Sequence, residues 1–95
     1  MIDGEFLLIE KENVKNLHFP DIDVLLNEKE IKEREEAIQR AISLGNLEHH
    51  KVKIYFSDKS GKKMINTTIW AVTDHSIVLK QNSIIPKKRI FKLEL

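Results

Sequence analysis

The chain has 95 residues, which suits a single domain with one modest core. It contains no cysteine, which excludes disulfides, thiol nucleophiles and thiolate metal sites. The net charge of +1 conceals two opposite halves: residues 1–50 carry six Lys or Arg against twelve Asp or Glu (−6), and residues 51–95 carry ten against three (+7). The longest apolar run is too short to cross a bilayer, and Asp3 and Glu5 contradict the basic start of a signal peptide. We therefore expect a cytoplasmic protein that binds no membrane.

Residues 1–26 are predicted to form an irregular acidic arm of the same domain. Its apolar islands are separated by the polar stretches EKEN and FPDID and show no sustained period. A short strand is expected at residues 5–10. Pro20 starts a turn, because proline fixes its own φ and restricts the residue before it.

Residues 27–45 carry the signals of one helix. Asn27 can cap the first turn, Glu30 stands three residues later as in a capping box, and Gly45 can supply the left-handed residue that ends the helix. The helical period brings together an apolar stripe that consists of Ile31, Ile38, Ala41 and Ile42. One face of the helix is therefore expected to be buried.

From residue 51 the apolar period changes to two, which is typical of strands. Five short strands are expected, joined by polar turns such as SDKSGK. The second, KMINTTIWAVTD, changes phase between Ile69 and Val72, which predicts a bend within one long strand. We predict an α+β, mainly β fold: an N-terminal helix followed by a five-stranded, strongly bent antiparallel SH3-like or Sm-like small barrel over residues 51–95.

The order of these elements carries a resemblance. A helix is followed by VKIYF, by Gly61 before a bent second strand, by AVTDHSIVLK and then by IPKKRI. Residues 31–95 thereby resemble the Sm-like fold, the family that includes the Hfq-type bacterial RNA chaperones. The resemblance implies a small β-barrel, and it puts Lys87 and Lys88 where Hfq-type proteins carry side chains that contact RNA. The chain departs from the pattern at Arg89, where the family has a small residue, and at Pro86, which lacks a backbone donor near the edge that joins Sm subunits.

The cations at residues 87–89 are the best candidate for a binding site, because three adjacent charges in one turn can contact phosphates. Lys80 can extend the basic surface. Tyr55 alternates away from the core and can offer an exposed ring to a base, whereas Trp70 is expected to be buried. The candidate nucleic-acid-binding residues are Lys87, Lys88, Arg89, Lys80 and Tyr55. The alternative is that these lysines only deter aggregation of strand edges.

No signature of an enzyme is present. The sequence has no Gly-rich phosphate loop, no nucleophile elbow and no paired carboxylates with a base. Ser57, Asp58 and Ser60 lie close together, but they fit an ordinary turn. His49 and His50 are adjacent, so a regular element would point them apart. We expect no catalysis, no cofactor and no metal.

Two functions remain open at this point. The favoured one is a small binding module for protein–protein interaction or self-assembly, in which the acidic helix and arm dock on the basic half of the same or a neighbouring chain. Its partner is an unknown protein or a second copy. The alternative is binding of RNA, or single-stranded nucleic acid generally, through the basic face of an Sm-like barrel.

Overall fold

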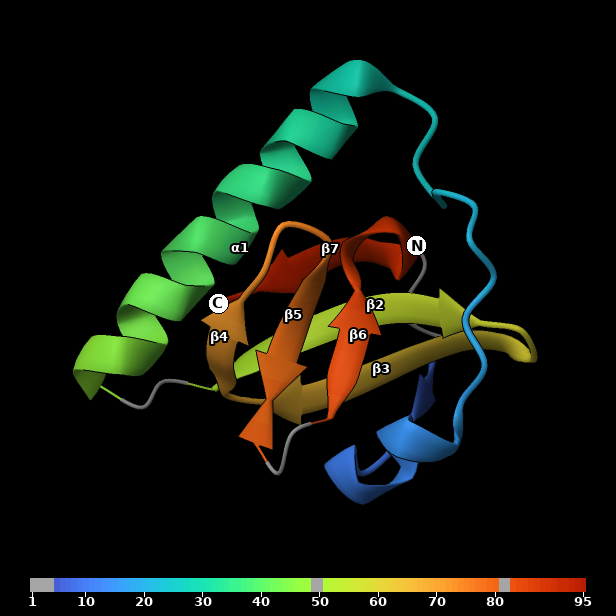
Figure 1. The fold of residues 1–95 in the computed structure, drawn as a ribbon, viewed down its shortest axis with the longest axis horizontal. Coiled ribbons are helices and arrows are strands. Elements are labelled where there is room, and N and C mark those ends of the chain that lie inside the picture. Colours follow the sequence, from blue (N-terminus) through green and yellow to red (C-terminus); the bar gives the residue numbers. More distant parts are fainter. Residues whose placement is uncertain (1–4, 49–50, 81–82) are drawn as a thin grey trace.

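The computed structural model describes residues 5–48, 51–80 and 83–95 (Figure 1). In the described part, strand β1 (Leu7–Leu8) is followed by the 3-10 helix η2 (Lys11–Asn16), an extended segment and helix α1 (Glu28–Glu48). The remaining elements are β2 (Val52–Asp58), β3 (Gly61–Thr67), β4 (Ile69–Val72), β5 (Ser76–Leu79), β6 (Ile84–Pro86), the 3-10 helix η4 (Lys87–Arg89) and β7 (Ile90–Glu94). Among the described residues, no helix is long and apolar enough to span a membrane.

The strands form two sheets and do not close into a barrel. One sheet has the order β1-β3-β2-β7, in which β1 runs parallel to β3 and the other neighbours are antiparallel. The second sheet has the order β4-β5-β6 and is entirely antiparallel. No ladder joins β6 to β7 in the described part of the chain. The predicted five-stranded SH3-like or Sm-like barrel is therefore wrong.

The chain changes sheets at the point where the sequence predicts a bend. β3 ends at Thr67 and β4 begins at Ile69, so the expected long strand is two strands that belong to different sheets. The register of β4 against β5 shifts between Ile69 and Ala71, as at a β-bulge. Trp70 and Ala71 are both exposed after this shift, whereas Ile69 is buried. The change of apolar phase thus marks a change of sheet.

The arm bonds to the turn η4 that connects β6 and β7. Arg89 in η4 is buried, and its guanidinium donates to the carbonyl oxygens of Ser57 (3.0 Å) and Ile22 (2.7 Å). The Val24 N–H donates to the Lys88 carbonyl oxygen at 2.8 Å. These contacts hold η4 in place between β6 and β7, which belong to different sheets.

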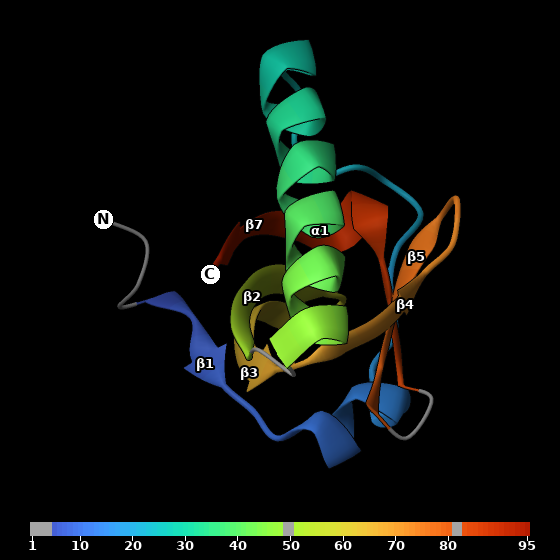
Figure 2. The same cartoon turned by 90° about the vertical axis from the view of Figure 1, so that its left-hand side faces the viewer.

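Helix α1 covers the opening between the two sheets, where it packs on β4 and β7 (Figure 2). It follows β1 and η2, so its description as an N-terminal helix is wrong. The predicted cap is confirmed, because the Asn27 Oδ1 accepts hydrogen bonds from the N–H groups of Lys29 (2.8 Å) and Glu30 (3.3 Å). The helix continues past Gly45 to Glu48, so the predicted end is wrong.

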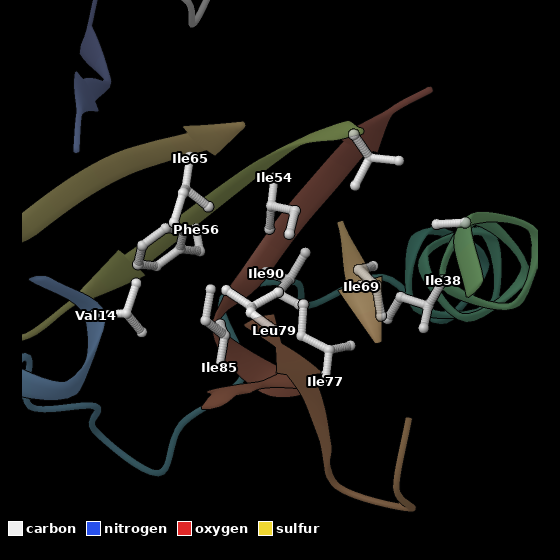
Figure 3. Packing of buried hydrophobic residues seen from close by; sticks show 12 residues of the cluster. Val14, Ile38, Ile54, Phe56, Ile65, Ile69, Ile77, Leu79, Ile85 and Ile90 are labelled. Atoms are coloured by element: carbon white, nitrogen blue, oxygen red, sulfur yellow. The ribbon is translucent and has the colours of Figure 1, made fainter. Parts of the chain in front are cut away.

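The core lies between the two sheets and α1 (Figure 3). Ile38 and Ala41 of the predicted stripe are buried in it. Val14 from η2 belongs to the same cluster, so part of the arm is a structural component of the core. The cluster consists of Val14, Ile38, Ala41, Val52, Ile54, Phe56, Ile65, Ile69, Ile77, Leu79, Ile85 and Ile90.

Arg34 ties α1, the arm and β7 together. Its guanidinium donates to both carboxylate oxygens of Asp23, at 2.8 Å and 2.7 Å, and to the Ile90 carbonyl oxygen at 3.0 Å. The hydrogen bond from Arg34 is the main reason that the pKa of Asp23 lies below its usual value, although partial burial opposes the shift. The Arg34 side chain is only 6% exposed, which is unusual for arginine unless it is paired, as it is here.

Replacement of Arg34 by methionine removes this tie. We expect Arg34→Met to lower the free energy of unfolding by about 2 kcal/mol or more, because the Asp23 carboxylate and the Ile90 carbonyl lose their partner. Urea denaturation followed by circular dichroism measures the change. Arg40→Met, on the exposed side of the same helix, is the matched control and should cost less than about 0.5 kcal/mol. Equal effects of the two substitutions would contradict this role.

Candidate functional site

Lys87, Lys88 and Arg89, which we name the basic turn, were predicted as a binding site. The basic turn borders a cleft of about 780 Å³. The cleft lies between the arm, the first turns of α1, the β4–β5 turn and η4. Lys87 and Lys88 line it together with acidic residues such as Asp21 and Glu35. The cleft therefore presents charges of both signs.

Each cation of this turn has a partner within the chain. The Lys87 Nζ lies 3.0 Å from the Glu35 carboxylate, and the Lys88 Nζ lies 3.4 Å from the Asp21 carboxylate. Arg89 bonds to protein carbonyls, as described above. Burial raises the pKa of Glu35, but hydrogen bonds from Gln39 and Lys87 outweigh it, so that the pKa lies below its usual value. A phosphate at this turn competes with carboxylates that are already in place.

The other two predicted residues lie elsewhere. Lys80 is exposed and follows the end of β5. The basic turn lies near the other end of this strand, where Ser76 pairs with Pro86 of β6. Tyr55 in β2 is 4% exposed, and its hydroxyl donates to the Glu94 carboxylate at 3.0 Å. The expected exposure of Tyr55 is therefore wrong, and the five candidates do not form one site.

The turn between β2 and β3 contains a buried ion pair. The Lys63 Nζ lies 2.6 Å from Asp58 Oδ1 and donates to the Ser60 hydroxyl oxygen at 2.8 Å. Burial raises the pKa of Asp58, but the hydrogen bonds from Lys63 and Ser60 outweigh it and hold the pKa below its usual value. Gly61 follows with φ of +142°, which only glycine adopts readily. These contacts fasten the hairpin, in agreement with the turn expected there.

The ion pair between Lys63 and Asp58 predicts that the folded protein loses stability at acidic pH. Because the folded pKa of Asp58 is lowered, its contribution is complete above the unfolded pKa of about 4 and is lost as the pH falls through the folded value. We expect Asp58→Asn to destabilise the protein at pH 7 and to reduce its loss of stability below about pH 4. Urea denaturation across this pH range measures both effects. Glu36→Gln, at an exposed carboxylate of α1, is the control and should change the free energy of unfolding at pH 7 by less than about 0.5 kcal/mol.

Exposed apolar side chains from three strands lie on the outer face of the sheet β4-β5-β6. Residues opposite one another in neighbouring strands share a face, and the register aligns Ala71 with Val78 and Val78 with Ile84. Trp70 is 58% exposed beside this row, and Ile84 is 50% exposed. We name these four residues, Trp70, Ala71, Val78 and Ile84, the outer apolar row.

The sequence reading missed this surface, because it expected Trp70 to be buried. That expectation is wrong. The available signal was the uninterrupted apolar runs IWAV, IVL and IIP, since strands with one solvated face normally alternate. Continuous apolar strands are typical of sheets that are covered on both faces.

Opposite charges stand at the two ends of β5, the middle strand of this sheet. Asp74 lies in the turn before β5, and Lys80 follows the end of β5. Both side chains are exposed, and within the described ranges neither forms an ion pair. The surface therefore has a charge at each end that is complementary to the other.

No family model matches the chain, and neither a curated protein nor a solved structure is significantly similar to it. The Sm-like resemblance therefore stays a prediction. In the described residues, no three His, Cys, Asp or Glu side chains are grouped as metal ligands are. His49 and His50 lie outside the described residues. The function is argued from the surfaces alone.

Proposed function

We propose that the chain is a self-association module whose outer apolar row packs against the same row of a second copy. The single observation that carries the proposal is the outer apolar row, which crosses three strands and includes a tryptophan that is 58% exposed. An exposed apolar cluster of this kind typically marks an interaction site. Tryptophan is also the residue type most enriched among those that dominate binding energy.

A second copy fits this surface because the surface is self-complementary. In a two-fold symmetric pair the same patch is used twice, and sheets that pack face to face lie about 10 Å apart. If the two β5 strands run antiparallel across the axis, Asp74 of one copy lies at the same end as Lys80 of the other. Rim charges of opposite sign then favour this orientation over the parallel one.

The internal ion pairs support this function over RNA binding at the basic turn. Lys87 pairs with Glu35 of α1, and Lys88 pairs with Asp21 of the arm. The acidic and basic halves of the chain therefore meet within one copy. RNA that binds at this turn must first displace these carboxylates, whereas a partner at the outer apolar row displaces only water.

Loss of the tryptophan tests the interface. We expect Trp70→Ser to weaken self-association about 30-fold, since truncation of such an anchor typically costs about 2 kcal/mol or more. Sedimentation velocity over a range of protein concentrations measures the dissociation constant. Leu26→Ser, at an apolar side chain that is 92% exposed on the arm, is the control and should have no effect. A wild-type chain that stays monomeric at millimolar concentration would refute the proposal.

Charge exchange tests the orientation of the two copies. We expect Asp74→Lys and Lys80→Asp each to weaken the dimer several-fold, because each places like charges together at the rim. The double variant should recover the original affinity, since it restores opposite charges at both ends. Failure of the double variant to recover would exclude the antiparallel arrangement.

A further inference from the structure

The outer face of the other sheet, β1-β3-β2-β7, has a different chemistry. Its register places Lys53 between Asn66 on β3 and Glu94 on β7. Tyr55, two residues further along β2, lies between Met64 and Lys92. Residues paired in this way share a face, and Ile54 and Phe56 point to the opposite face, into the core. Lysine and aromatic side chains therefore alternate on the surface that faces away from the core.

Three aromatic rings meet on this face. The ring of Phe6 lies 5.1 Å from that of Tyr55 and 5.6 Å from that of Phe91, both edge to face. Phe6 and Phe91 are partly exposed, and Tyr55 is buried beneath them. The hydrogen bond from the Tyr55 hydroxyl to Glu94 fixes the floor of the cluster. Phe6 and Phe91 are therefore held in place, and part of each side chain is exposed to solvent.

Lysines surround the rings. The Lys62 Nζ lies 5.7 Å from the ring centre of Phe6 and 5.8 Å from that of Phe91, and the Lys92 Nζ lies 4.9 Å from that of Tyr55. Lys51 and Lys53 line an adjoining hollow of about 280 Å³. We name Phe6, Tyr55, Phe91, Lys51, Lys53, Lys62 and Lys92 the lysine–aromatic face.

These lysines are more available to an anion than Lys87 and Arg89 of the basic turn. The Lys62–Glu5 and Lys92–Glu94 pairs, at 2.8 Å and 3.3 Å, are solvent-exposed on both sides. Exposed pairs of this kind contribute little to stability, so an anion can replace the carboxylate at small cost. At the basic turn Arg89 is buried, and the Lys87 side chain is only 13% exposed.

We propose that the lysine–aromatic face binds single-stranded nucleic acid, with bases against Phe6 and Phe91 and phosphates at Lys53 and Lys62. Aromatic rings accept unpaired bases by stacking, which a duplex cannot offer, and lysines track the backbone. An acidic peptide supplies the negative charge but no bases. The face is distinct from the outer apolar row, so this activity goes beyond the proposed self-association.

Binding can be measured by fluorescence anisotropy with labelled RNA and DNA strands of the same sequence, about 12 nucleotides long. We expect binding at low salt for at least one of the two strands. The double variant Lys53→Gln/Lys62→Gln should reduce the affinity about tenfold and lower the salt slope by about 1.4, which corresponds to two phosphate contacts. Phe6→Leu, which keeps an apolar side chain but removes the ring, should reduce the affinity about fivefold.

Matched controls separate this face from the other surfaces. Lys88→Gln, at an exposed lysine of the basic turn, should leave binding unchanged. Trp70→Ser should weaken self-association about 30-fold and leave nucleic-acid binding intact, so failure of one proposal is distinguishable from failure of the other. Circular dichroism checks the fold of each variant.

Four results would overturn the proposal. They are no binding of either strand at low salt, a larger loss with Lys88→Gln than with the double lysine variant, equal affinity for the matching duplex, and equal affinity for an acidic peptide with no effect of Phe6→Leu. The last two would identify a surface that attracts any polyanion.

Discussion

The hydrogen bonds that fix the acidic arm to the two buried guanidinium groups are the constraint on which the rest of the structure depends. Arg34 on α1 holds the Asp23 carboxylate, and Arg89 in η4 holds the Ile22 carbonyl oxygen. A guanidinium can satisfy several acceptors in fixed directions, which lysine cannot. Two cations from distant elements thus fix the same stretch of arm against α1 and η4.

This arrangement also explains the opposite charges of the two halves of the chain. The acidic arm and helix lie against the basic turn, where Asp21 and Glu35 pair with Lys88 and Lys87. The basic residues that suggest a binding site in the sequence therefore serve in part to hold the arm and α1 in place. The lysines that remain accessible beside aromatic rings belong to β2, β3 and β7.

The two sheets do not close into a barrel, so each has its own outer face, and the two outer faces differ in chemistry. α1 covers the gap between β4 and β7, and the core fills the space between the sheets. The sheet β4-β5-β6 presents an apolar surface. Such a surface suits a protein partner, because association removes apolar area from water, which is favourable. The sheet β1-β3-β2-β7 presents rings and lysines, which suit a ligand that has both bases and phosphates. The two proposals therefore concern different faces and are independent.

The sequence by itself determined those structural features that depend on residues close together in the chain. Asn27 caps α1 through its own side chain, and the apolar phase change near Ile69 marks the break between β3 and β4. Only the tertiary structure decided that the sheets stay open, that Arg34 is buried, that Tyr55 is covered and that Trp70 is exposed. Alternation along a strand separates its two faces, but which face is covered depends on segments far away in the chain. Phe6, which packs over Tyr55 from 49 positions earlier, is such a segment.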